Sequence, residues 1–216
     1  SEAGAFVYLV GRSAEKLKAI QETLPNKAES EIIDADYSTV DGAKELKDKI
    51  KALLGQKKLD VVLASSGPWW PVTKLAQQAD IDTLYKATQA NFNAQLFLYN
   101  ILAPACKPEG QFLMLNGAAA LDLVGIGLTA IMANACVGAS KVMFDECSKS
   151  SDMPNYTHVL LSSSVGHAAF RHNTYDPIEY GKGFVAMALN KHIKSKDGSG
   201  TLELDDAMYE RLAASF

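Results

Sequence analysis

Apolar and polar positions follow two patterns along this chain, one typical of strands and the other typical of helices. Short runs rich in β-branched, leucine and aromatic residues, closed by turn residues, indicate buried strands. These runs occupy residues 5–12, 30–38, 59–67, 110–117, 157–166 and, as a last strand and turn, 199–206. Longer segments with an apolar residue at every third or fourth position indicate amphipathic helices. Such helices are expected at residues 13–24, 39–55, 81–103, 134–150 and 176–193.

The predicted strands and helices alternate along the chain, and this order indicates the fold class. Helical connections between parallel strands are right-handed crossovers, which place helices on both faces of the sheet. The run at 59–67 is apolar enough to be covered on both faces. We therefore expect an α/β fold: a Rossmann-type three-layer sandwich with a mostly parallel sheet. The 216 residues, of which 48% are hydrophobic, suit a single domain spanning 1–216.

The carboxyl ends of the predicted strands are the expected place for a ligand, because open parallel sheets bind their ligands there. Small and polar residues stand at these ends, and they allow a ligand to approach the backbone. They are Gly11-Arg12, Asp36 to Ser38, Ser65 to Gly67, Asn116-Gly117 and Val165-Gly166. This expectation depends only on the strand pattern.

Composition narrows the classes of partner. The formal net charge of -4, with scattered basic residues, argues against nucleic acid. No apolar run reaches the roughly 20 residues of a membrane span, and no secretory signal opens the chain. The three cysteines (Cys106, Cys136 and Cys147) lack metal-ligand spacing, and an odd number of thiols fits a reducing compartment. We expect a cytoplasmic protein with no metal, no nucleic-acid partner and no membrane.

The segment 134–150, taken with strands 59–67 and 110–117, resembles the short-chain dehydrogenase/reductase family. The active-site helix of that family carries Tyr-x-x-x-Lys. Here the lysine is Lys141, whereas the tyrosine position holds Val137. The resemblance covers nearly the whole chain. It implies a Rossmann fold that binds NAD or NADP, and a homo-oligomer in which helices 81–103 and 134–150 pack across a two-fold axis.

Several positions match residues that hold the cofactor in this family. Arg12 resembles the arginine that meets the 2′-phosphate of NADP, since a guanidinium offers forked donors to phosphate; it could also be a surface arginine near a helix start. Asp36 resembles the aspartate that accepts from the adenine amino group, or it is a cap or turn residue. Ser65 and Gly67 belong to ASSG, which resembles the strand end Asn-Asn-Ala-Gly. Lys141 resembles the lysine that binds the ribose hydroxyls, or it is a residual charge on a helix.

The catalytic positions depart from the family. The serine position aligns with Gly117, or with Asn116 if the alignment shifts by one, and the tyrosine position is Val137. Valine cannot exchange a proton with a carbonyl oxygen. Asn91 resembles the helix asparagine that holds a water on the proton relay, or it braces its helix. His167, in the loop after strand 157–166, could replace the missing acid, or it is a solvated loop residue.

A pair of tryptophans follows the strand end at Ser65 to Gly67. Trp69 and Trp70, between two prolines, could wall an apolar substrate pocket together with Asn116 and Val137. Alternatively, one tryptophan packs inward and the other covers an interface.

The amino-terminal segment also departs from the family, which opens with a strand and a Gly-x-x-x-Gly-x-Gly turn that cradles pyrophosphate. Residues 1–12 carry no such turn. The missing strand normally lies between those that match 5–12 and 59–67. We expect that a segment carrying it is absent from the sequence; the alternative is that the two neighbours pair directly.

Three functions fit these observations. The first is a diverged relative that binds or transforms a small apolar molecule without ordinary carbonyl reduction. The second is an active NAD(P)(H)-dependent oxidoreductase that uses an acid other than tyrosine. The third is a pseudoenzyme that acts as a dimerising or regulatory partner. Cofactor titration distinguishes them.

Overall fold

The structure is a computed structural model that describes residues 4–68, 70–117, 127–162, 177–189 and 200–214. The chain forms two compact units, Ser1–Lys57 and Lys58–Phe216. Each unit is described by itself below. The expectation of a single domain spanning 1–216 stays a prediction.

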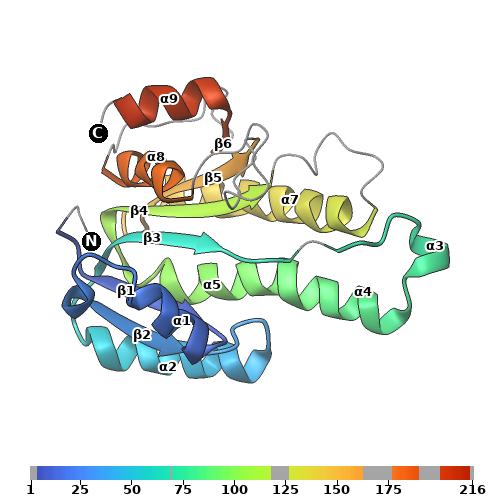
Figure 1. Ribbon diagram of the computed structural model, residues 1–216, viewed down its shortest axis with the longest axis horizontal. Coiled ribbons are helices and arrows are strands. Elements are labelled where there is room, and N and C mark those ends of the chain that lie inside the picture. Colours follow the sequence, from blue (N-terminus) through green and yellow to red (C-terminus); the bar gives the residue numbers. More distant parts are fainter. Residues whose placement is uncertain (1–3, 69, 118–126, 163–176, 190–199, 215–216) are drawn as a thin grey trace. The chain divides into compact units, whose positions relative to one another are not determined.

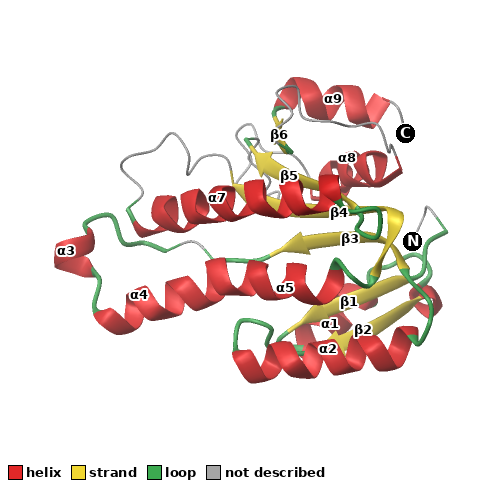
Figure 2. Ribbon diagram, turned by 180° about the vertical axis from the view of Figure 1, so that it is seen from behind, coloured by secondary structure: helices red, strands yellow, loops and turns green. Residues whose placement is uncertain are grey.

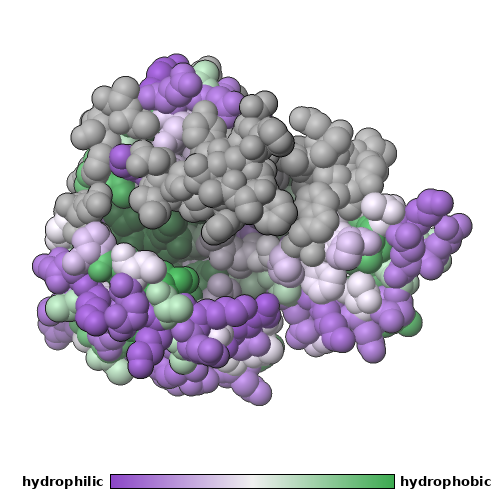
Figure 3. Space-filling model, in the orientation of Figure 1, coloured by the Kyte–Doolittle hydropathy of each residue, from purple (hydrophilic) through white to green (hydrophobic). Residues whose placement is uncertain are grey.

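The first unit contains a pair of parallel strands with their helices. Its elements are β1 (Val7–Gly11), α1 (Ala14–Gln21), the 3₁₀ helix η1 (Lys27–Glu29), β2 (Ser30–Asp34) and α2 (Val40–Leu54). The register of the pair aligns Val7 with Ser30 and Gly11 with Asp34. Ser13 caps α1 by accepting a hydrogen bond from the backbone of Lys16, as its place before an amphipathic segment predicts. Figure 3 shows a mostly hydrophilic surface over α1.

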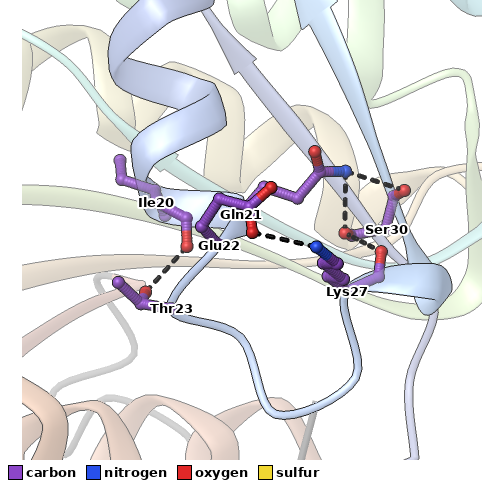
Figure 4. Close-up of polar contacts among 6 residues, drawn as sticks. All are labelled: Ile20, Gln21, Glu22, Thr23, Lys27 and Ser30. Carbon is purple, nitrogen blue, oxygen red and sulfur yellow. Dashed lines mark hydrogen bonds and ion pairs between the residues drawn. The ribbon is translucent and has the colours of Figure 1, made fainter.

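The connection from α1 to β2 is fixed by side chains (Figure 4). The Gln21 amide donates to both the carbonyl and the hydroxyl oxygen of Ser30, at 3.1 and 3.0 Å. The Ser30 hydroxyl donates in turn to the Lys27 carbonyl at 2.7 Å. Lys27 also pairs with Glu22 at 2.9 Å, and its hydrogen bond and charge lower the pKa of that carboxyl. These contacts satisfy polar groups at the point where the chain turns back into the sheet.

The second unit is built on a four-stranded sheet with the order β3-β4-β5-β6. Every pairing in it is parallel, which confirms the expected α/β fold with a mostly parallel sheet. The strands are β3 (Leu59–Ser65), β4 (Cys106–Gly117), β5 (Asn155–Leu161) and β6 (Thr201–Leu204). The helices are α3 (Leu75–Gln78), α4 (Ile81–Ala87), the π-helix η2 (Thr88–Asn93), α5 (Ala94–Leu102), α7 (Leu128–Lys149), α8 (Pro177–Leu189) and α9 (Asp206–Ala214). Figure 1 shows the strands of this sheet with their carboxyl ends at the same edge.

The two faces of this sheet are covered by different helices. On one face, Phe112 of β4 lies against Tyr99 of α5 and stacks on Tyr156 of β5, with ring centroids 5.8 and 5.7 Å away. Figure 2 looks onto α5 and α7, which belong to this face. On the opposite face, Leu113 and Val159 pack in one buried cluster with residues of α8 and α9. The second unit is therefore a three-layer sandwich.

Two helices differ from the prediction in ways that matter for the site. The expected helix 81–103 is present, but its middle, η2, is a π-helix, a feature that often marks functional sites. The expected helix 134–150 begins six residues earlier, at Leu128. Its first turn therefore belongs to the carboxyl edge of the sheet.

The last predicted strand, within 199–206, is confirmed as β6, and the helix α9 that follows it was not predicted. Two further predictions need correction. The second strand ends at Asp34, since the next residues form a turn before α2. Val61 and Leu63 of β3 are exposed, so the expectation that both faces of residues 59–67 are covered is wrong. Among the described residues, no helix combines the length and the apolar character that a membrane span requires.

Candidate functional site

A cavity of about 270 Å³ opens at the carboxyl edge of the four-stranded sheet, where the strand pattern predicted a ligand site. Its walls come from the ends of β3, β4 and β5, from η2 and from the first turns of α7. The lining residues are Ser65, Ser66, Gly67, Pro68, Asn91, Leu115, Asn116, Gly117, Thr129, Met132, Ala133, Cys136 and Leu161. This volume is just below the usual range of ligand pockets, so it suits a small molecule.

The cavity brings together four of the predicted site residues. Ser65 ends β3 and Gly67 follows it, Asn116 is the last residue but one of β4, and Asn91 lies on η2. Gly117, which aligns with the family's serine, also lines the wall. Residues that are far apart in the sequence thus meet at one edge, because the carboxyl ends of parallel strands share that edge.

Asn91 is held on both sides by the segment that follows β3. Its Oδ1 accepts a hydrogen bond from the Trp70 indole at 2.7 Å, and its Nδ2 donates to the Pro68 carbonyl at 3.1 Å. Gly67 has a φ of 107°, and a Cβ there would lie 2.4 Å from Asn91 Nδ2. The close approach that Gly67 allows is therefore to Asn91. These contacts favour the bracing role for Asn91.

Trp70 ties the segment after β3 to the start of α7. Its backbone N–H donates to the Thr129 hydroxyl at 2.9 Å, and that hydroxyl donates back to the Trp70 carbonyl at 3.1 Å. The ring packs against a buried cluster that includes Val72 and Leu128. Trp70 is therefore a clamp at the border of the cavity and is not one of its lining residues. Trp69, the other tryptophan of the pair, lies outside the described residues.

A chain of buried polar side chains reaches the cavity through Asn116. The amides of Gln95 and Asn116 bond reciprocally: Gln95 Nε2 donates to Asn116 Oδ1 at 2.6 Å, and Asn116 Nδ2 donates to Gln95 Oε1 at 3.2 Å. Asn116 Nδ2 also lies 2.7 Å from His158 Nε2. Gln95 Nε2 makes a longer contact, 3.4 Å, with the Ser66 carbonyl.

The described lining of the cavity carries no charged side chain. Among the described residues that line it, only Cys136 has an ionisable side chain, and burial raises the pKa of this thiol to about 12. The thiol therefore stays protonated near neutral pH, and a protonated thiol is a poor nucleophile. Beneath the cavity, burial lowers the pKa of His158 to about 4, so this imidazole is neutral as well.

The other two predicted site residues on α7 lie away from the cavity wall. Val137 is half-buried and Lys141 is exposed, and neither belongs to the cavity wall. Their neighbour Cys136 occupies the wall position on α7. The roles expected for Val137 and Lys141 stay predictions. His167 lies outside the described residues.

Arg12 and Asp36 lie in the first unit, at the ends of its two parallel strands. Arg12 is exposed, and its guanidinium has no hydrogen-bond or ion-pair partner among the described residues. Asp36 Oδ1 accepts from the backbone N–H and the hydroxyl of Ser38, at 3.2 and 2.6 Å. Between them, Tyr37 has a raised pKa because burial outweighs the positive charge of Arg12. Asp36 thus makes the hydrogen bonds of a turn residue, and the cofactor roles expected for Asp36 and Arg12 stay predictions.

Sequence reasoning missed two residues of the polar chain. Gln95 stands four positions after Asn91 and is almost fully buried, although its helix is otherwise apolar there. His158 stands directly before the apolar end of β5 and is fully buried. A polar residue beside an apolar run was the available signal, because buried polar groups need partners.

Comparisons with known proteins agree with this geometry. No protein-family model matches the sequence, and no curated protein matches it. Solved structures do match. The structure described as ElxO with NADP bound has a TM-score of 0.74 at 14% identity, covering 97% of this chain and 90% of that chain. A short-chain dehydrogenase from Streptomyces avermitilis has a TM-score of 0.68 at 15% identity, covering 99% and 84%. The NADP active-site complex of RhlG from Pseudomonas aeruginosa has a TM-score of 0.65 at 16% identity, covering 99% and 80%. This chain therefore has the fold of the short-chain dehydrogenase/reductase structures, as the sequence resemblance implied.

Proposed function

We propose that this chain is a diverged short-chain dehydrogenase/reductase-like protein that binds or transforms a small, uncharged, largely apolar molecule without ordinary carbonyl reduction. The observation that carries the proposal is the chemistry of the cavity wall. Leu115, Met132 and Leu161 supply apolar surface, and the polar lining side chains are neutral hydroxyls and amides apart from the protonated thiol. A charged ligand would find no counter-charge among the described lining residues, which is costly.

The positions that would supply a proton support the same proposal. Val137 and Gly117 stand where the family has tyrosine and serine, and neither side chain can donate a proton to a carbonyl oxygen. The neutral Cys136 thiol is a weak donor in the wall, with its Sγ 3.9 Å from the Asn91 carbonyl.

The residues present fit NADP or NAD in part. Arg12 fits the 2′-phosphate of NADP, because its exposed guanidinium has no partner among the described residues. Ser65 lines the cavity at the end of β3, whereas the space beside Gly67 is taken by Asn91 and is closed to a cofactor. The described residues contain no Gly-x-x-x-Gly-x-Gly turn for the pyrophosphate. When bound, the nicotinamide would supply or accept a hydride.

The replacement Arg12→Gln is expected to weaken NADPH binding about tenfold while NADH binding stays unchanged, since a forked, charge-assisted contact to phosphate is lost. Calorimetric titration of both cofactors measures the two affinities. Lys18→Gln, which removes a charge from the same unit, is the matched control and should leave both affinities unchanged. Equal weakening of NADPH and NADH would contradict the assignment of Arg12 to the 2′-phosphate.

Cofactor titration combined with a turnover assay tests the proposed function. We expect no NADPH-dependent reduction of acetophenone by the chain, whereas a small apolar molecule is retained in the cavity. Tight NADPH binding with rapid turnover would instead support an oxidoreductase that uses another acid. A protein that binds neither cofactor nor small molecule, but forms a stable hetero-complex, would support the role of a regulatory pseudoenzyme.

The double replacement Val137→Tyr with Gly117→Ser is expected to raise acetophenone reduction on the order of 10²-fold, because it supplies a proton donor and a second hydrogen-bond donor. Position 117 has room for the serine, since an added Cβ meets no described atom within 4 Å. Val137→Phe with Gly117→Ala is the matched control, which adds similar volume without hydroxyl groups. A measurable wild-type rate equal to that of the double variant would contradict the proposal, whereas no rate in either protein would show that the loss of these two groups is not the only lesion.

We also propose that the chain forms a homo-oligomer through the helices at 81–103 and 134–150. Apolar side chains on these helices are exposed, and exposed apolar groups that gather on a surface often mark an interface. They are Ile81 and Tyr85 of α4, and Ile131 and Val142 of α7. Sedimentation equilibrium of the purified chain decides this point.

A further inference from the structure

His158 is a buried imidazole that the proposed function does not yet use. It lies in the apolar strand β5 and is fully buried, yet it contacts a cavity-lining residue. Its Nε2 lies 2.7 Å from Asn116 Nδ2, and its Nδ1 has no hydrogen-bond partner among the described residues.

The Ser66 backbone carbonyl determines which side-chain groups donate and which accept in the hydrogen bonds of Gln95, Asn116 and His158. The Ser66 carbonyl can only accept, so the group of Gln95 that faces it must be the amide nitrogen. With Gln95 turned this way, its Oε1 receives the Asn116 nitrogen, and its Nε2 donates to Asn116 Oδ1. The Asn116 nitrogen then also faces His158, so His158 Nε2 must be the acceptor and Nδ1 must carry the proton.

This arrangement of donors and acceptors determines which hydrogen bond the Asn116 side chain can make with a ligand. An amide nitrogen has two hydrogens, and both are taken here, one by Gln95 and one by His158. The remaining hydrogen-bonding capacity of the Asn116 side chain is a lone pair on its carbonyl oxygen. The Ser66 hydroxyl, which also lines the cavity, has no partner among the described residues.

We propose that His158 is a positioning residue that holds Asn116 so that the cavity presents a carbonyl oxygen to a hydroxyl or N–H group of the ligand. This inference rests on the proposed function and narrows its ligand to a neutral molecule with a hydrogen-bond donor. If Nε2 of His158 carried the proton instead, two donors would face each other at 2.7 Å, and both amides would have to turn. The turned Gln95 would then direct its oxygen at the Ser66 carbonyl, which also only accepts.

The tautomer of His158 in the unmodified protein is the first test. Nitrogen-15 NMR of the histidine side chains, with the His158 signals identified by their loss in His158→Gln, should show a protonated Nδ1 and an unprotonated Nε2 at pH 7. A protonated Nε2 would overturn the inference. This measurement needs only the folded wild-type chain, and it does not depend on any ligand.

Ligand preference is the second test, with 1-phenylethanol and acetophenone as probes and no cofactor present. The alcohol has a donor and the ketone has none, so NMR titration of the wild type should show about 3- to 10-fold tighter binding of the alcohol. In His158→Leu one hydrogen of the Asn116 amide loses its acceptor, so a ketone can compete for it and the preference should fall to near one. His158→Gln, whose Oε1 can accept the same hydrogen bond, should restore the preference.

The outcomes separate the inference from the proposed function. A preference for the alcohol that persists in folded His158→Leu overturns the positioning role alone. A folded wild type that binds neither probe overturns both the donor-recognition step and the proposed small-molecule site. If His158→Leu does not fold, the tautomer in the wild type decides the positioning role.

Discussion

Replacing Gly127 by alanine is expected to lower the free energy of unfolding by about 3 kcal/mol and to abolish ligand binding in the cavity. Gly127 precedes α7 with a φ of 51° and a ψ of -116°, a conformation that L-residues rarely adopt. A Cβ at this position would also lie 2.1 Å from the Val72 carbonyl oxygen. That carbonyl accepts a hydrogen bond from the Leu128 backbone at 3.0 Å, so the clash falls on the contact between the segment after β3 and the start of α7.

Urea denaturation of Gly127→Ala beside Gly181→Ala measures this effect. Gly181 lies inside α8, and an added Cβ there meets no described atom within 4 Å. The control should therefore stabilise the chain by about 0.5–1 kcal/mol, because alanine favours a helix interior over glycine. Equal stabilities for the two variants would show that the segment after β3 and the start of α7 can separate at little cost.

The contact between the segment after β3 and the start of α7 also explains why the sequence did not reveal the role of Trp70. A tryptophan after a ligand-facing strand end is compatible with a pocket wall, and the composition of the loop does not distinguish a wall from a clamp. Thr129 decides between them, because its hydroxyl bonds both backbone groups of Trp70. These two residues are 59 positions apart, so their contact exists only once the sheet has brought the ends of β3 and α7 together.

The parts of the fold that the sequence predicted are those that depend on local periodicity. The buried strand around Phe112 and the helix around Val142 have clear patterns, and their alternation determined the parallel sheet and its ligand edge. The carboxyl-edge rule then placed Ser65, Gly67 and Asn116 in one site before any contact was known.

The parts that the sequence did not predict depend on long-range partners. From the sequence, Asn91 could equally hold a water molecule or stabilise its helix. Only its contacts with Pro68 and Trp70 favour the stabilising role. His158 looked like one polar residue in an apolar strand, and its importance appears only through Asn116 and Gln95. A polar network of this kind is defined by tertiary neighbours, and therefore no spacing rule along the chain could have identified it.

His158 should also make the stability of the chain depend on pH. Burial lowers its pKa from 6.5 to about 4 in the folded state, so between these pH values the unfolded chain binds more protons than the folded chain. The stabilisation is present above pH 6.5 and is lost as the pH falls toward 4. Its size is about 3 kcal/mol, from the difference between the two pKa values.

The comparison of wild type with His158→Gln isolates this contribution, because the other groups that titrate between pH 4 and 7 are shared by both proteins. We expect the free energy of unfolding of the wild type to fall by about 3 kcal/mol more than that of His158→Gln over this range. Urea denaturation at several pH values gives the two curves. Parallel curves would mean that His158 accepts a proton in the folded chain. The side-chain amides of Asn116 and Gln95 would then have to flip at mildly acidic pH. The cavity would thereby lose the carbonyl oxygen of Asn116 as a hydrogen-bond acceptor.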